Sequence, residues 1–504
     1  MSDEAVIGRR GDAAAPRGAL GALSTLFVFF ALSALVLAGC ATMAPLPLEE
    51  ADVPPGWLGP VYDDADVWPN TDWWNNFNDA ELAAFIDEVK ASNLDLANNR
   101  RNLEAAQLTL REAKLARWPN PQVEIGDGTS FTSRRVDGST VSSGNVPEDT
   151  QIVGSAVFGN ILTKPATYAR DLTDYESQLA LSADVAMNTL VTATSTYFQL
   201  LLIRDRIVAA RQNLENAEVI GRIAQARLDA GVSVPIDTLQ QQIQIEQQRT
   251  ALESLVQADL AARASLALLV GRHVQGFDVG GQTLQNVEVP RVQPGLPSEL
   301  LVRRPDLFQA ELDLRAAAIS VTIARRSLFP QISLTSSATA SSAALTDIVS
   351  SPSLSTFNIS ASLVQTLLDN GARRRDIERA KLFVENSLAS YRRAVLGAFN
   401  EVEVALSDIR LLEQQAEVAA SSLEAAEEAF RIAQVRYEEG VADFQTVLQA
   451  QNTLFSTRNA FLDNKLQRLN AVLSFYQALG GGWQPGDIAE YWGVTADGGA
   501  FAFR

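Results

Sequence analysis

Two stretches of the sequence, Ile223-Ala224-Gln225-Ala226-Arg227 and Ile432-Ala433-Gln434-Val435-Arg436, lie at an offset of 209 residues and differ only in their fourth residue. The same offset relates Gly231-Val232 to Gly440-Val441, Pro121-Gln122 to Pro330-Gln331, and Gly271 to Gly480. A register that persists over so long a distance indicates an internal duplication. Two copies of about 200 residues therefore fill most of the region from residue 80 to residue 480.

The sequence pattern of each copy predicts the same order of elements: a helix, two strands around a polar loop, a long helix and a return helix. In the first copy these are residues 79–117, strands 121–131 and 151–160, and helices 167–229 and 235–270. In the second they are residues 305–328, strands 331–340 and 356–366, a helix over 371–438 and, after the stop at Gly440, a return helix that ends at residue 479. Gly231 and Gly440 are expected to end the long helices, because glycine readily takes positive φ. The turns at 231–237 and 440–446 are then the tips of two helical hairpins.

The helix lengths predict how the helices pack. A helix over residues 167–229 is about 95 Å long, and the two shorter helices of the same copy together reach about the same length. Two short helices stacked end to end can therefore match one long helix. The many small residues in these helices favour close antiparallel packing in a long hollow wall.

The four predicted strands are typical of a membrane barrel, which makes the expected fold class α+β. Phe357, Ile359 and Leu363 alternate with polar residues, as do Val123 and Ile125. Four strands cannot close by themselves, and open strand edges are not tolerated in lipid. The barrel must therefore be shared between chains: eight strands would need two copies and twelve would need three.

The first 39 residues are typical of an export signal. Arginines at positions 9, 10 and 17 precede an apolar run from Leu26 to Ala38, and Gly39 and Cys40 follow it. Thirteen helical residues rise about 20 Å, which is short of the hydrocarbon core, so an uncleaved anchor is the weaker alternative. Leu37-Ala38-Gly39-Cys40 resembles the lipobox of bacterial lipoproteins, which predicts acylation of Cys40. The alternative for Cys40 is a buried structural cysteine.

Composition excludes several classes of function. The 504 residues hold 41 Lys and Arg against 60 Asp and Glu, a net charge of −19, so a nucleic acid would be repelled over most of the surface. One cysteine and one histidine leave no disulfide framework, no zinc cluster and no nucleophile paired with a base. We therefore expect no enzyme, no metal and no cofactor.

The segment that follows the first copy suggests a family. Gly295-Leu296-Pro297-Ser298-Glu299-Leu300-Leu301-Val302-Arg303-Arg304-Pro305-Asp306-Leu307 resembles the outer-membrane efflux (TolC) family, in its lipoprotein branch of RND-type systems. Three other segments fit the same branch: Trp73-Trp74, Phe329-Pro330-Gln331-Ile332 and Leu479-Gly480-Gly481-Gly482-Trp483. As a local structure, Arg303-Arg304-Pro305-Asp306 is typical of a helix start, with proline in the first helical position.

The resemblance implies a homotrimer in the outer membrane, lipid-anchored at Cys40. Three chains would share a twelve-stranded barrel above a periplasmic helical tunnel. The segment 40–78, the linker 273–304 and the tail 483–504 would form a belt around the tunnel formed by the repeats 79–272 and 305–482. The implied function is the exit duct of a tripartite pump, which passes small molecules such as drugs from an inner-membrane RND transporter and a periplasmic adaptor.

Two alternatives to this function remain open from the sequence. A duct for type I protein secretion shares the expected fold, whereas the lipobox and the branch-specific residues favour efflux of small molecules. A lipid-anchored scaffold that conducts nothing would explain the helices, but it would not explain the amphipathic strands.

The two hairpin tips are the candidate functional site, as the periplasmic entrance implied by the resemblance. Three copies of Asp237 and Asp443 around one axis would form an acidic ring that draws cations; alternatively, either aspartate caps a helix. Gln445 and Gln449 can hydrogen-bond across the axis. At position 449 the family usually has an aspartate, so the gate is expected to be more loosely latched. Gly231, Val232, Gly440, Val441 and Phe444 are the expected docking residues for the adaptor.

Overall fold

A computed structural model of the chain describes residues 53–58, 69–128, 133–136, 139–142, 149–280, 283–291, 293–342 and 354–483. The chain divides into two compact units, residues 1–50 and 51–504, and every described residue belongs to the second. The predicted signal segment 1–39, Cys40 and the tail beyond Trp483 lie outside the described residues.

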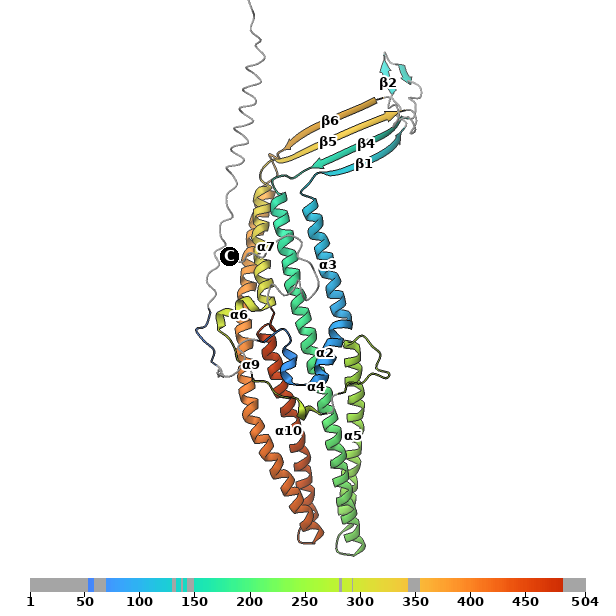
Figure 1. Cartoon of the computed structure of the whole chain (residues 1–504), viewed down its shortest axis with the longest axis vertical. Helices are drawn as coiled ribbons and strands as arrows, with labels where there is room; N and C mark the ends of the chain where they lie inside the picture. The colour runs from blue at the N-terminus through green and yellow to red at the C-terminus, as the bar shows by residue number, and fades with distance from the viewer. Residues whose placement is uncertain are drawn as a thin grey trace, which may run out of the picture. The chain divides into compact units, whose positions relative to one another are not determined.

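Both repeats contain the same order of elements (Figure 1). The first repeat consists of α2 (Ala80–Ser92), α3 (Leu94–Leu115), β1 (Asn120–Gly128), β4 (Asp149–Phe158), α4 (Lys164–Asp229) and α5 (Pro235–Leu269). The second consists of α7 (Pro305–Arg326), β5 (Gln331–Ser342), β6 (Leu354–Val364), α9 (Ala372–Glu438) and α10 (Phe444–Ala478). The short helices η1 (Trp73–Phe77) and η2 (Leu284–Asn286) lie outside the two repeats, and the short helix α6 (Pro297–Arg303) directly precedes α7.

Two expectations about the first repeat were wrong. The single helix expected over residues 79–117 is interrupted at Asn93, which is extended and caps α3 by accepting a hydrogen bond from the Leu96 amide. The polar loop between the first two strands contains a further antiparallel pair, β2 (Ser133–Val136) and β3 (Ser139–Ser142). A short run such as Ser-Arg-Arg-Val lacks the alternation that identifies longer strands in a sequence.

One four-stranded antiparallel sheet joins the two repeats. Its order is β1-β4-β5-β6, so β4 of the first repeat pairs with β5 of the second, and β1 and β6 are the outer strands. Asn120 pairs with Val157, Phe158 with Leu334, and Gln331 with Val364. These pairs show that all four connections to the helices leave from the same end of the sheet.

Each long helix packs along two shorter helices, as the helix lengths predicted. Helix α4 lies against α3 and α5, and α9 lies against α7 and α10, while α4 also contacts α7 and α10 of the other repeat. Among the described residues, no helix is both long enough and apolar enough to cross a membrane.

The short helices meet end to end at two equivalent joints. In the first repeat, the Asn93 side-chain amide donates to the carbonyl oxygen of Leu269 at 2.7 Å. In the second, the Arg304 guanidinium donates to the carbonyl oxygen of Ala478 at 2.9 Å. Leu269 and Ala478 are related by the offset of 209, and each contributes one of the last carbonyl groups of a return helix, which have no partner within the helix. The residue that precedes α3 or α7 therefore binds the end of the return helix of the same repeat, α5 or α10.

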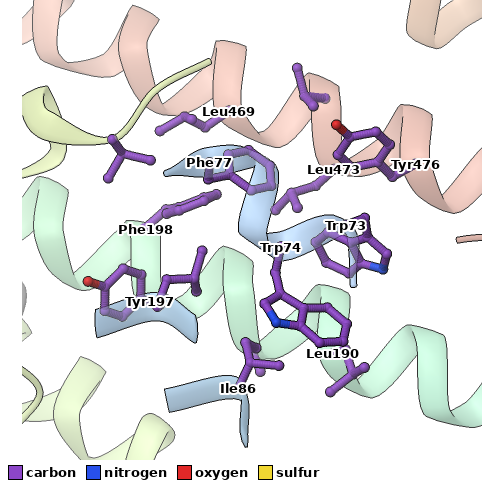
Figure 2. Close-up of a cluster of buried hydrophobic side chains, with 14 of the residues drawn as sticks. Trp73, Trp74, Phe77, Ile86, Leu190, Tyr197, Phe198, Leu469, Leu473 and Tyr476 are labelled. Carbon is purple, nitrogen blue, oxygen red and sulfur yellow. The ribbon is translucent and has the colours of Figure 1, made fainter. Parts of the chain in front are cut away.

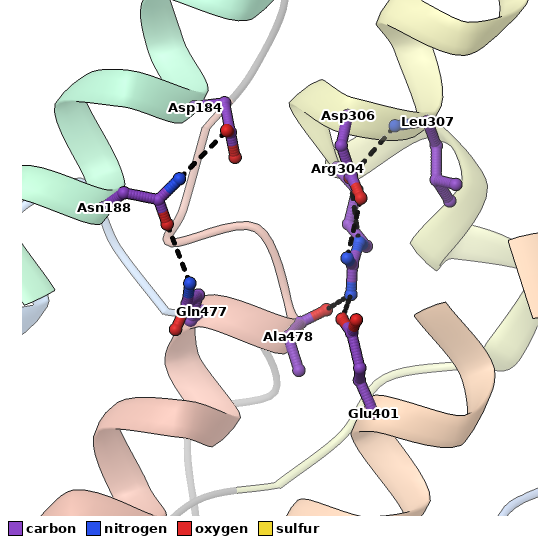
Figure 3. A network of polar contacts seen from close by, with 8 residues as sticks. All are labelled: Asp184, Asn188, Arg304, Asp306, Leu307, Glu401, Gln477 and Ala478. Carbon is purple, nitrogen blue, oxygen red and sulfur yellow. Dashed lines mark hydrogen bonds and ion pairs between the residues drawn. The ribbon is translucent and has the colours of Figure 1, made fainter. Parts of the chain in front are cut away.

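Arg304 binds more partners than Asn93 does (Figure 3). Its guanidinium also pairs with Asp306 and Glu401, at 2.7 Å each, and its side chain is buried. A β-carbon at Gly480 would lie 2.2 Å from the Arg303 carbonyl oxygen, which explains a glycine where the chain leaves α10. Nearby, burial raises the pKa of Asp184, with Asp306 adding to the rise.

An aromatic cluster ties the N-terminal segment to both repeats (Figure 2). Trp73, Trp74 and Phe77 of η1 are buried among side chains of α4 and α10, and the Phe77 ring meets Phe198 at 5.1 Å. The Tyr197 hydroxyl donates to the carboxylate of Asp79 at 2.9 Å, and the same carboxylate caps α2. The aromatic cluster is part of the largest group of buried apolar side chains among the described residues.

Candidate functional site

The two hairpin tips have the same backbone conformation, because the same local sequence ends both long helices. Gly231 and Gly440 have φ of 73° and 74°, the left-handed region that glycine enters without steric cost. The Val232 amide donates to the Arg227 carbonyl oxygen at 3.0 Å, and the Val441 amide donates to the Arg436 carbonyl oxygen at 2.9 Å. These bonds form a Schellman motif, which satisfies the last carbonyl groups of each long helix.

The two candidate aspartates occupy different positions in their tips. Asp443 is the N-cap of α10, and its carboxylate accepts hydrogen bonds from the amide and the hydroxyl of Thr446 at 2.8 and 2.6 Å. These bonds lower the pKa of the exposed Asp443 carboxylate, the side-chain hydroxyl having the larger effect. In the offset of 209, Asp443 corresponds to Val234 and Asp237 corresponds to Thr446.

Asp237 therefore lies within the first turn of α5 and is not its N-cap, which is Val234. The alternative prediction, that Asp237 is a helix N-cap, was wrong, because Val234 holds the N-cap position and its side chain has no hydrogen-bond acceptor. The Asp237 carboxylate instead accepts a hydrogen bond from the Ser233 hydroxyl at 2.6 Å. A carboxylate in the first turn also lies favourably at the positive end of the helix dipole.

The tips of the two hairpins contact each other through Arg227 of α4 and Tyr437 of α9. The Arg227 guanidinium lies 4.9 Å from the centre of the Tyr437 ring and donates to the carbonyl oxygen of the same residue at 2.8 Å. Burial raises the pKa of the Tyr437 hydroxyl, and the charge of Asp237 raises it further. A cation, an aromatic ring and a carboxylate from both repeats thus meet directly behind the tips.

Neither Arg227 nor Tyr437 was among the residues selected from the sequence. The signal was present, because Arg227-Leu228 corresponds to Arg436-Tyr437 in the duplication. Tyr437 places an aromatic ring where the first repeat has Leu228, one turn before the tip. An aromatic ring at that position is a reason to expect contact with a nearby arginine.

The glutamines of the second tip lie on its surface. The Gln445 side-chain amide donates to the side-chain oxygen of Gln240 at 3.1 Å, which adds a second bond between the two hairpins. Gln449 is exposed, and the described residues give its side chain no hydrogen-bond partner. Farther along the same helices, the Gln244 amide donates to Asn452 at 2.9 Å.

Phe444 was wrongly included among the docking residues. Its side chain is only 4% exposed, because the ring packs in the core of the second hairpin with its centre 6.0 Å from that of Tyr437. Val232 and Val441 are 62% and 67% exposed, so they remain accessible to a partner.

Equivalent ion pairs hold each hairpin together above its tip. Arg249 of α5 pairs with Glu218 of α4 at 3.2 Å, and Arg458 of α10 pairs with Glu427 of α9 at 3.0 Å. Both pairs obey the offset of 209. Arg458 also donates to Asn213 of α4 at 3.1 Å, so it joins the second hairpin to the first.

Within the described residues, no group of three or more histidine, cysteine, aspartate or glutamate side chains could hold a metal ion. The predicted lipid site, Cys40, lies outside them. The geometry described here therefore comprises a sheet with two open edges and, at the other end of the long helices, two linked tips.

Comparisons with known proteins agree with this architecture. A sequence profile of the family described as outer membrane efflux protein matches residues 85–272 and 296–481, the two repeats. The pyoverdine export outer membrane protein OpmQ of Pseudomonas aeruginosa is 30% identical over 459 residues, which cover 90% of this chain and 96% of the relative. The outer membrane protein OprJ of the same species is 28% identical, over 91% of this chain and 97% of the relative.

The solved structures show the same fold. The open state of the MtrE outer membrane channel of Neisseria gonorrhoeae superposes with a TM-score of 0.77 at 21% identity. The alignment covers 88% of this chain and 99% of that channel.

Proposed function

Since the chain belongs to the outer membrane efflux protein family, we propose that three copies of it form the outer-membrane exit duct of a tripartite RND-type pump. The observation that carries the proposal is the combination of a four-stranded sheet with two open edges and two helical hairpins linked at their tips. The sheet provides a route through the outer membrane, and the hairpins provide a closable entrance in the periplasm.

The open edges of the sheet support a trimer. The outer strands β1 and β6 belong to different repeats, so β6 of one chain can pair with β1 of the next. Pairing of this kind around a ring leaves no strand edge exposed to lipid. Three chains would contribute twelve strands, the number expected for this family from the resemblance described above.

The duct conducts passively in this proposal. Its cargo is a small molecule, in keeping with relatives whose names refer to pyoverdine export, toluene efflux and cation efflux. An inner-membrane transporter supplies the driving force, and a periplasmic adaptor binds the exposed valines of the tips, Val232 and Val441. Cys40 carries the lipid anchor, and the chain itself performs no chemical reaction.

The entrance is closed by contacts between the hairpins. Arg227 binds the backbone and the ring of Tyr437, and Gln445 binds Gln240. Opening of the entrance requires the hairpins to separate at these points. Asp237 supplies negative charge close to the same contacts, so the open aperture would favour cations.

Deletion of the gene in its native host tests the proposal against the secretion alternative. Loss of an efflux duct should increase the accumulation of a fluorescent dye that RND pumps export, while the proteins in the culture medium stay the same. Re-expression of the chain should restore low accumulation. Unchanged dye accumulation together with the loss of a secreted protein would overturn the proposal in favour of type I secretion.

A further inference from the structure

Lysine and arginine side chains are concentrated in the segments that connect the helices to the sheet. Four segments connect the sheet to the helices, residues 114–118, 159–164, 325–330 and 365–375, and we call them the collar. The collar contains eight cations, namely Lys114, Arg117, Lys164, Arg325, Arg326, Arg373, Arg374 and Arg375. It contains one carboxylate, Asp369, although the whole chain has a net charge of −19.

The sheet register brings these segments to one level of the molecule. All four strands have their helix-connected ends at the same end of the sheet, as the pairs Asn120 with Val157 and Gln331 with Val364 show. Contacts between the segments support this placement. Arg326 donates to the carbonyl oxygen of Leu162 at 3.2 Å, and Gln365 donates to that of Leu328 at 3.1 Å.

Most of the collar cations lack an acidic partner. Arg373 pairs with Asp369 at 3.8 Å, but within the described part of the chain the other seven form no ion pair with a carboxylate. Lys164 lies over the ring of Phe158, and Arg117 lies over the ring of Tyr168, contacts that leave the positive charge uncompensated. Arg325, Arg374 and Arg375 are exposed.

Large apolar side chains are exposed at the same level. Leu367 and Leu368 are 88% and 92% exposed, and Trp118 is 73% exposed. Leu115, Leu328 and Phe329 are exposed as well. Aromatic and aliphatic side chains mixed with lysine and arginine are typical of protein surfaces at the boundary between the hydrocarbon and the headgroups of a bilayer.

We propose that the collar binds the headgroups of anionic phospholipids in the membrane leaflet that faces the periplasm. The exposed leucines and Trp118 enter the edge of the hydrocarbon, while the guanidinium and ammonium groups bind the phosphates of lipids such as phosphatidylglycerol. This lipid preference rests on the proposed function in one respect, the insertion of the sheet into the outer membrane.

Electron spin resonance of chain-labelled lipids tests the proposal on the purified full-length protein in phosphatidylcholine bilayers. Lipid in contact with the protein gives a motionally restricted signal. Labelled phosphatidylglycerol should show at least about twofold stronger association than labelled phosphatidylcholine, since each basic residue near an anionic surface contributes attraction. Raising the salt from about 0.05 M to about 0.5 M should reduce the preference, because exposed charges are screened.

A pair of matched variants assigns the preference to the collar. The triple variant Arg325→Gln, Arg374→Gln, Arg375→Gln should bring the two lipids close to equal association. The control Arg211→Gln, Arg222→Gln, Arg410→Gln removes the same charge from exposed positions on α4 and α9 and should keep the preference. If the collar variant does not assemble, the salt dependence of the unaltered protein carries the test.

Three results would overturn the proposal in distinguishable ways. Equal association of both lipids with the unaltered protein would show that the collar has no lipid preference, although the sheet is inserted. Competition by inorganic phosphate at constant ionic strength would show a site for free phosphate. The absence of any restricted lipid signal would contradict insertion itself, and with it the proposed function.

Discussion

Arg227 and Tyr437 form a contact between the two repeats at the tips of the hairpins. The guanidinium lies 4.9 Å from the ring centre and donates to the carbonyl oxygen of the same tyrosine at 2.8 Å. A cation over an aromatic ring contributes about 0.5–1 kcal/mol at a partly exposed site, and a hydrogen bond contributes about 1 kcal/mol. In the proposed duct, a contact of this size would influence the equilibrium between closed and open tips.

Replacement of Arg227 by leucine should open the tips. The loss of about 2 kcal/mol from the closed state shifts the ratio of open to closed forms by about 30-fold, which should appear as a higher basal conductance of the purified trimer. Arg222→Leu removes an exposed arginine from the same helix and should leave the conductance unchanged. Equal conductance of the two variants would mean that closure depends on other contacts.

Two variants separate the charge of Asp237 from its hydrogen bond. Asp237→Asn removes the negative charge but keeps an oxygen that can accept a hydrogen bond from Ser233. With this substitution in all three chains, the channel should show a weaker preference for cations. Ser233→Ala removes the hydrogen bond and keeps the charge, so the preference should remain. The reversal potential in a salt gradient measures both. A preference retained in Asp237→Asn would exclude this aspartate from the selectivity of the entrance.

Asp443 should act on the local stability of α10. Asp443→Ala removes the N-cap, so the amide of Thr446 should exchange with solvent faster, whereas Asp443→Asn keeps an acceptor and should exchange more slowly than the alanine variant. The lowered pKa of Asp443 fixes the pH dependence. The ionised Asp443 carboxylate stabilises the folded state fully above the ordinary aspartate pKa of about 4. This stabilisation is lost as the pH falls through the lower pKa of the folded state. Identical exchange in the alanine and unaltered proteins would contradict the capping role.

The two joints between short helices should differ in strength. Arg304→Met leaves the Ala478 carbonyl and two carboxylates without their partner, at a cost of about 2–3 kcal/mol. Asn93→Ala removes a neutral hydrogen bond to Leu269 and an N-cap, at about 1–2 kcal/mol. Thermal unfolding at one scan rate should therefore show a lower midpoint for Arg304→Met than for Asn93→Ala. The reverse order would show that the ion pairs of Arg304 contribute little.

The order of elements could be predicted from the sequence because the same pattern of helices and strands occurs in both repeats. A weak strand such as β4 gains support from its counterpart β6, and Gly231 and Gly440 identify both tips. The break at Asn93 could not be found in this way, since the first residue of α7 is a proline, Pro305, whereas α3 begins at Leu94. The side chains that face the other repeat, above all Arg227 and Tyr437, depend on which side of each helix packs inward. The burial of Phe444 depends on the same packing.

The offset of 209 already separates the two aspartates, because it pairs Asp237 with Thr446 and Asp443 with Val234. Asp237 lies six residues after Gly231 and Asp443 three residues after Gly440, although both aspartates were assigned to one acidic ring. In the structure Asp443 is an N-cap, whereas Asp237 lies three residues beyond the N-cap of its helix and binds Ser233. Both return helices begin four residues after their glycines, at Pro235 and Phe444. The three-residue difference in the position of the aspartate therefore separates a structural role from a candidate role in selectivity.

Current through single molecules in a planar lipid bilayer tests the central claim most directly, namely that the assembled chain conducts from one side of a membrane to the other. The purified, full-length trimer should produce discrete conductance steps whose size rises with the salt concentration. A bilayer that stays at background current, with the protein shown to be inserted by its protection from added protease, would contradict the account and favour a scaffold that conducts nothing.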